Sequence, residues 1–195
     1  MLSEIGWTVA ARYRRGPAEA RMSEVSAMTQ VAKPQVPEEL VQGLAWRDAS
    51  DPAFTVNGLP WFEENGRTFL RFPKRAQSRL REPVWQLSLA PSGGRVRFAT
   101  DSGTLRLIVH HAADIGSLHM VHFCAVGMSG IDLYEGPPER MTFWCASRPA
   151  PADIKQPYLC EYLKNLPRRR REFTLYLPTY VPLASLRIGL DPDAT

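Results

Sequence analysis

Short runs of β-forming residues, separated every few positions by turn residues, occupy the chain from residue 54 onward. In one run, Val96 and Phe98 point to one side and Arg95 and Arg97 to the other, as in a strand with one buried face. No helical periodicity comes between these runs. Two antiparallel sheets packed face to face would bury the apolar sides of all of them. The sequence therefore predicts an all-β fold, an antiparallel β-sandwich of jelly-roll-like type.

Ten strands are expected, at residues 54–56, 68–72, 84–89, 95–99, 104–110, 120–126, 130–134, 141–145, 172–177 and 185–190. The run 120–126 is apolar on both faces and is predicted to be a central strand. Residues 112–116 and 157–166 are expected to form irregular or helical insertions. Residues 1–50 lack the strand pattern, so we interpret them as a poorly ordered, largely irregular N-terminal arm, and residues 51–195 as the β-sandwich domain.

Composition argues against several classes of partner. The formal net charge of +4 is too mild for a typical nucleic-acid-binding protein. No stretch approaches the roughly 20 apolar residues that span a bilayer, and the first residues do not resemble a secretory signal. Cys124, Cys145 and Cys160 form no CxxC pair, so we expect reduced thiols and a cytoplasmic setting.

The segment Asp101-Ser102-Gly103-Thr104 offers two readings as a catalytic site. It is similar to the active-site loop of retropepsin-like aspartic proteases, in which two Asp carboxylates from a dimer share a proton. It also contains Asp-Ser, as in the Gly-Asp-Ser nucleophile block of SGNH hydrolases, but Thr100 stands where that block has glycine. Asp-Ser-Gly between two strands is also typical of an ordinary β-turn, which is the interpretation we favour.

The rest of the sequence gives little support for a catalytic nucleophile or a metal site. A serine nucleophile needs a base that a third group orients, yet all four histidines lie between residues 110 and 122. His110 and His111 would face opposite sides of a strand, and His119 and His122 would diverge as well, so no metal site and no cofactor are expected. The basic run 168–171 is interpreted as a solvated loop.

Six short phrases in a fixed order carry a family resemblance. They are Phe-Leu-Arg-Phe-Pro at 69–73, Val-Trp-Gln-Leu-Ser at 84–88, Val-Arg-Phe-Ala-Thr-Asp-Ser at 96–102, Gly-Ile-Asp-Leu-Tyr at 130–134, Thr-Leu-Tyr-Leu-Pro-Thr-Tyr at 174–180 and Leu-Arg-Ile-Gly at 186–189. Together they resemble the domain found ahead of SGNH-hydrolase-type (GDSL-like) esterases and named for its Gly-x-Asp-Leu-Tyr motif. The resemblance covers about residues 54–195.

The resemblance implies a β-sandwich that accompanies an α/β esterase domain, which supplies the catalytic Ser, Asp and His. No catalytic residue is therefore expected in this chain. The motif positions are expected to serve structure or an interface: Trp85, Ser88, Asp101, Ser102, Gly130, Asp132, Leu133, Tyr134, Tyr176, Pro178 and Tyr180. Leu133 is expected to pack inward and Gly130 to serve a turn.

The leading hypothesis is a non-catalytic accessory domain of an esterase that hydrolyses carbohydrate or acyl esters. Its partner would be an SGNH-type catalytic domain, in the same chain or a separate one, with a carbohydrate ester as a further ligand. A stand-alone carbohydrate- or protein-binding sandwich is the alternative. A dimeric aspartic protease that uses Asp101 is a third, less favoured hypothesis.

Overall fold

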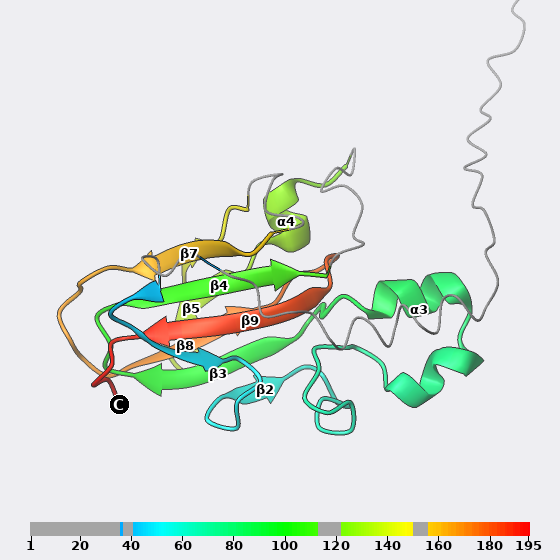
Figure 1. Ribbon diagram of the computed structural model, residues 1–195, viewed down its shortest axis with the longest axis horizontal. Helices are drawn as coiled ribbons and strands as arrows, with labels where there is room; N and C mark the ends of the chain where they lie inside the picture. The colour runs from blue at the N-terminus through cyan, green and yellow to red at the C-terminus, as the bar shows by residue number, and fades with distance from the viewer. Residues whose placement is uncertain (1–35, 37–40, 113–121, 150–155) are drawn as a thin grey trace, which may run out of the picture. The chain divides into compact units, whose positions relative to one another are not determined.

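Nine strands form two antiparallel sheets in the part of the chain that the computed structural model describes, residues 36, 41–112, 122–149 and 156–195 (Figure 1). The strands are β1 (Ala45–Asp48), β2 (Thr55–Asn57), β3 (Arg95–Thr100), β4 (Leu105–His111), β5 (Asp132–Glu135), β6 (Thr142–Ala146), β7 (Tyr158–Leu163), β8 (Arg171–Tyr176) and β9 (Leu183–Leu190). Three short helices lie wholly within the same described ranges: η1 (Lys74–Arg79), α3 (Glu82–Ser88) and α4 (Ala125–Ser129).

One sheet has the strand order β1-β9-β4-β7, and the other has the order β2-β3-β8-β5-β6. Alternate residues along the strands are apolar, and their side chains point from both sheets into one shared core. Leu105 and Leu107 of β4 and Ile188 of β9 are fully buried in the same cluster as Leu133 of β5 and Leu175 of β8. The prediction of an all-β fold built from two antiparallel sheets is thus confirmed.

The segment 84–89, predicted as a strand, lies instead almost wholly in the helix α3. Pro83 sits in the first turn of α3, where its missing N–H costs nothing because that donor has no intrahelical partner. A short apolar run cannot be assigned to helix or strand from periodicity alone. The segment 68–72 also forms no strand, although Phe69 is buried in the core.

Two further predicted segments differ in the structure. Residues 157–166, expected to be an irregular or helical insertion, contain β7, which pairs with β4 along its length. Residues 125–126, expected in a central strand, begin the helix α4. Residues 120–121 of that predicted strand, residues 113–116 of the predicted insertion, and His119 lie outside the described residues.

The first strand falls within the range that we expected to be an arm. β1 pairs antiparallel with β9, with Ala45 opposite Leu190 and Asp48 opposite Arg187. The Trp46 ring lies over the backbone of Gly189, where an added Cβ would come 2.8 Å from the ring. Its indole Nε1–H donates to the carbonyl oxygen of Val41 at 2.8 Å. The sheet therefore extends at least as far back as residue 45.

Candidate functional site

The Asp-Ser-Gly turn between β3 and β4 is part of a buried hydrogen-bond network. Ser102 is fully buried, and its Oγ donates to the carbonyl oxygen of Thr104 at 2.6 Å and accepts from the backbone N–H of Asp191 at 2.9 Å. The Gly103 N–H donates to the Asp191 carboxylate at 2.8 Å. These bonds tie the turn to the chain just after β9. The described hydrogen bonds of the Ser102 hydroxyl go to backbone groups of Thr104 and Asp191, and no histidine is among its partners, so the turn lacks the base that would activate a serine nucleophile.

Arg168 holds residues 193–195 against Asp101. Its guanidinium donates to the Asp101 carboxylate at 2.9 Å and to the Asp193 carboxylate at 2.5 Å. The Thr195 N–H donates to Asp101 Oδ1 at 2.8 Å, and the Asp101 N–H donates to the Thr195 carbonyl oxygen at 3.1 Å. The Thr195 N–H, with Arg168, lowers the pKa of Asp101. Asp101 is therefore held as a carboxylate by an arginine, which is not the proton-sharing state of an aspartic-protease dyad.

The basic run is only partly the solvated loop that we expected. Arg171 is buried, and it donates to the carbonyl oxygens of Arg169 at 3.3 Å and Pro167 at 3.0 Å. Arg168 makes the contacts to Asp101 and Asp193. These roles depend on chain segments far apart in sequence, and for this reason charge patterning alone could not show them.

The pairing of β5 with β8 in the five-stranded sheet puts the side chains of Asp132, Tyr134 and Tyr176 on the same face. Asp132 lies opposite Tyr176 in the ladder between β5 and β8, and Tyr134 follows two positions later. Leu133 between them is fully buried, as expected, so its two neighbours point outward. The ladders of β3 and β6 bring two more residues to this side. We call the set the tyrosine face: Arg95, Asp132, Tyr134, Phe143 and Tyr176.

The side chains of the tyrosine face form a continuous row across four strands. The Arg95 guanidinium carbon lies 5.7 Å from the centre of the Tyr176 ring. The Tyr176 and Tyr134 ring centres are 5.2 Å apart, and those of Tyr134 and Phe143 are 5.5 Å apart, both in edge-to-face geometry. The row ends at the sheet edge, where Phe143 is 54% exposed and Trp144 is 40% exposed. Large aromatic rings are thus presented to solvent on an edge strand.

Several polar groups on this face have no partner among the residues that the structure describes. The Nε atoms of Arg95 and Arg97 and the Oγ1 atom of Thr174 are buried without a hydrogen bond. The half-buried Asp132 carboxylate makes no hydrogen bond or ion pair with a described residue, and burial raises its pKa. Buried polar groups in folded proteins nearly always have partners. The described residues therefore leave several hydrogen-bonding groups on this face without partners.

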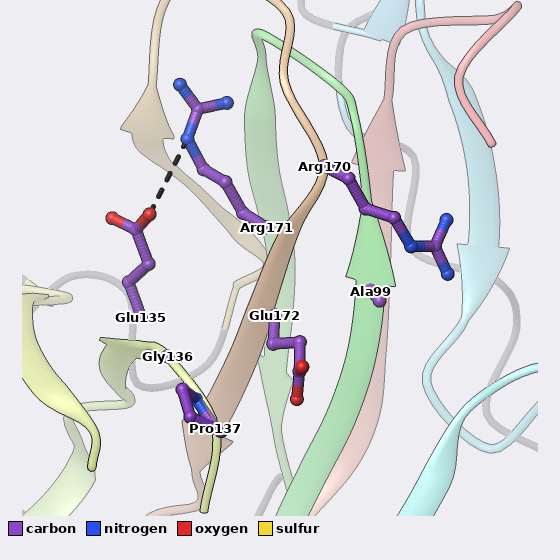
Figure 2. A pocket seen from close by; sticks show the side chains of 7 residues that line it. All are labelled: Ala99, Glu135, Gly136, Pro137, Arg170, Arg171 and Glu172. Atoms are coloured by element: carbon purple, nitrogen blue, oxygen red, sulfur yellow. Dashed lines mark ion pairs between the residues drawn. The ribbon is translucent and has the colours of Figure 1, made fainter.

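A shallow hollow of about 450 Å³ opens at the other end of the same sheet. Figure 2 shows the residues that line it: Ala99, Glu135, Gly136, Pro137, Arg170, Arg171 and Glu172. Arg171 faces Glu135 at 3.7 Å, and Arg169 pairs with the same carboxylate at 2.9 Å. A second hollow shares Ala99 and Glu172 with the first. Both are open, and their charged residues are largely paired with one another, so neither is organised as an enclosed catalytic pocket.

The remaining motif residues lie apart from the tyrosine face. Trp85 and Ser88 are buried in α3, and Pro178 is buried after β8. A Cβ on Gly130 would overlap the carbonyl oxygen of Val126 at the end of α4, so the motif requires glycine there. Tyr180 is 48% exposed, and its ring packs against Phe123 at 5.4 Å.

The structure thus brings five of the motif residues into two groups: Asp132, Tyr134 and Tyr176 in the tyrosine face, and Asp101 and Ser102 in the network at the turn. Sequence reasoning missed Arg95, Phe143 and Arg168 as members of these groups. The outward alternation of Arg95 with Val96 was visible in the sequence, but its stacking on Tyr176 depends on register.

The described histidines and cysteines, the other residues considered for chemistry, do not form a metal site. Among the described residues, no three His, Cys, Asp or Glu side chains come together in a way that could hold a metal ion. His110 and His111 are both buried, and burial lowers the pKa of His111 to about 4. Cys124, Cys145 and Cys160 are unbonded thiols, and burial raises the pKa of Cys145 and of Cys160 to about 11. No helix within the described ranges has the length and apolar character needed to cross a bilayer.

Comparison with known proteins identifies a family and several solved structures with a similar fold. The sequence model of the family described as "GxDLY: N-terminus of Esterase_SGNH_hydro-type" matches residues 44–195. No curated protein matches the chain. A protein described as a GDSL-like lipase, from Bacteroides ovatus, has a similar fold with a TM-score of 0.66 and 22% identity over 78% of this chain and 42% of its own.

The second structure is a salicylyl-acyltransferase from a tetracycline biosynthetic pathway, with a TM-score of 0.52 and 19% identity over 79% of this chain and 41% of its own. The chain therefore spans less than half the length of either protein. At 22% and 19% sequence identity, these two similarities show a shared fold.

Proposed function

Because the chain belongs to the family of N-terminal domains of SGNH-hydrolase-type esterases, we propose that it is a non-catalytic accessory domain of such an esterase. An SGNH-type catalytic domain, in the same chain or in a separate one, carries out the hydrolysis of carbohydrate or acyl esters. The free thiols support a reducing, cytoplasmic setting as part of the same proposal.

The single observation that carries the proposal is the structural use of Ser102. Its hydroxyl is fully buried and bonded to backbone groups of Thr104 and Asp191. A nucleophilic serine must reach substrate and must hydrogen-bond a base that removes its proton. A hydroxyl in the position of Ser102 does neither. The catalytic-looking segment at residues 101–104 therefore serves to hold the turn in place.

The same reasoning weakens the aspartic-protease hypothesis, since Arg168 and the Thr195 N–H hold Asp101 ionised. A stand-alone binding module remains a second candidate, because exposed Phe143 and Trp144 could stack on a sugar ring. Binding of unsubstituted oligosaccharides by the isolated chain would favour this candidate over the accessory domain.

An assay of the purified chain with a small chromogenic acetate ester tests the proposal. We expect no hydrolysis above the buffer rate, and no difference between the chain and its Ser102→Ala variant. Hydrolysis that Ser102→Ala abolishes would overturn the proposal. Proteolysis with an acidic optimum that Asp101→Asn removes would support the protease hypothesis in its place.

A further inference from the structure

We propose that the tyrosine face is the surface on which the SGNH-type catalytic domain docks, and that this partner donates a hydrogen bond or a cation to Asp132. The inference rests on the proposed function and deepens it by naming the face, the anchors and the chemistry of the partner surface. That surface has an apolar centre opposite Tyr134 and Phe143, and a basic or N–H group opposite Asp132.

The first argument is the exposed aromatic row. Phe143, at 54% exposed, and Trp144, at 40%, stand next to each other on the edge strand β6, and Tyr134 and Tyr176 continue the row inward. Edge strands that expose apolar side chains invite pairing with another chain unless something covers them. Aromatic residues and arginine are the residue types enriched at protein interfaces, and Arg95 stacks at the inner end of this row.

The second argument is the set of unsatisfied polar groups. Asp132 has no partner among the described residues, although it is half-buried and lies beside Tyr176 in the ladder. Unlike the partly exposed Asp132 carboxylate, the Oγ1 atom of Thr174 and the Nε atoms of Arg95 and Arg97 on this face are buried, and they make no hydrogen bond with a described residue. Unpaired buried polar groups lower the stability of an isolated domain. A partner surface that supplies the missing donors and acceptors would satisfy these groups.

The third argument is position. The network of Arg168, Asp101 and Thr195 lies beside Thr100 and Arg171, where β3 ends and β8 begins, so it borders the five-stranded sheet. A domain joined after residue 195 would start at the end of the five-stranded sheet where β3 ends and β8 begins. Arg95 and Tyr176 lie at the opposite ends of these two strands, so the domain would extend along the strands to cover the tyrosine face. The similar solved structures extend well beyond the length that this chain covers.

The test measures binding of the full chain to an SGNH-type catalytic domain produced without its own front domain. The probe is the catalytic domain encoded directly after residue 195 or, for a separate chain, in the same genome. We expect Phe143→Ser and Asp132→Asn each to weaken the dissociation constant by about tenfold, as for anchor residues of an interface. Two matched variants should change it less than about twofold. They are Leu87→Ser, at an equally exposed apolar site on α3, and Glu161→Gln, on β7 of the other sheet.

A second measurement, thermal unfolding of the isolated chain, checks that each variant is folded. Asp132→Asn is expected to raise the melting temperature at pH 7.5, because it removes a half-buried charge that has no partner. Binding that is unchanged in Phe143→Ser and Asp132→Asn would overturn the docking face and leave the proposed function in place. Failure of the wild-type chain to bind the catalytic domain would overturn the proposed function and the docking face with it.

Discussion

Replacing Ser102 with alanine tests whether the catalytic-looking turn is structural. The substitution removes a hydroxyl that donates to the Thr104 carbonyl oxygen at 2.6 Å and accepts from the Asp191 N–H at 2.9 Å. Both backbone groups lose a partner. Leaving a buried polar group unpaired costs about 1–3 kcal/mol. Asp191 is only half-buried and can rebond to water, so we expect a total loss of about 2–4 kcal/mol in the free energy of unfolding.

A loss of this size is a large share of the roughly 5–15 kcal/mol that stabilises a typical domain. Urea unfolding followed by tryptophan fluorescence should show a lower midpoint with an unchanged slope, because the surface exposed on unfolding stays the same. Ser50→Ala provides the control. The Ser50 hydroxyl also bonds within a turn, to Asp48 at 2.6 Å, but that bond is exposed and water can replace it. We expect the control to lose less than about 1 kcal/mol.

Equal unfolding midpoints for Ser102→Ala, Ser50→Ala and the wild type would refute the reasoning, since the buried network would then contribute nothing. A destabilised Ser102→Ala variant that still shows no change in ester hydrolysis is the outcome that the structure predicts.

Three other predictions concern separate parts of the fold. Gly130→Ala should lower the free energy of unfolding by about 1–3 kcal/mol, seen in urea unfolding, because its Cβ would overlap the carbonyl oxygen of Val126. Arg168→Ala should speed amide hydrogen exchange at Thr195, since one side of the contact that holds this segment is lost; unchanged exchange would contradict it. The pKa of His111 is lowered by burial from 6.5 to about 4, so the unfolded chain binds the proton more readily, and stability is expected to fall by about 3 kcal/mol as pH drops from about 6.5 to about 4. Urea midpoints across this range should show a drop that His111→Gln reduces, and an identical drop in both proteins would count against it.

The sequence was sufficient for the fold class because alternation is a local property. The run 95–99 forms β3, and the run 185–190 lies within β9, as predicted. Residues 84–88 became a helix because a run of that length suits both structures, and only Pro83 at its start pointed to a helix. Residues 158–163 became β7 because pairing with β4 overrides their weak strand pattern.

The candidate site was less accessible to prediction. The motif located Asp132 and Tyr134, and the inward direction of Leu133 followed from alternation. The meeting of Tyr134 with Tyr176 depends on the register between two strands about forty residues apart, which sequence does not specify. The pairing of Arg168 with Asp101 depends on the same kind of long-range placement.

The pairing of β1 with β9 also determines how the domain responds to mechanical force. Ala45 and Leu190 are direct partners in the ladder, so the start of the first strand and the end of the last lie about 5 Å apart. Tension applied at these two points would act across the ladder and break its hydrogen bonds one pair at a time. Among the described strands, β1 is an edge strand with β9 as its single neighbour. Under load it is therefore expected to peel away first, while the two-sheet core behind it stays closed.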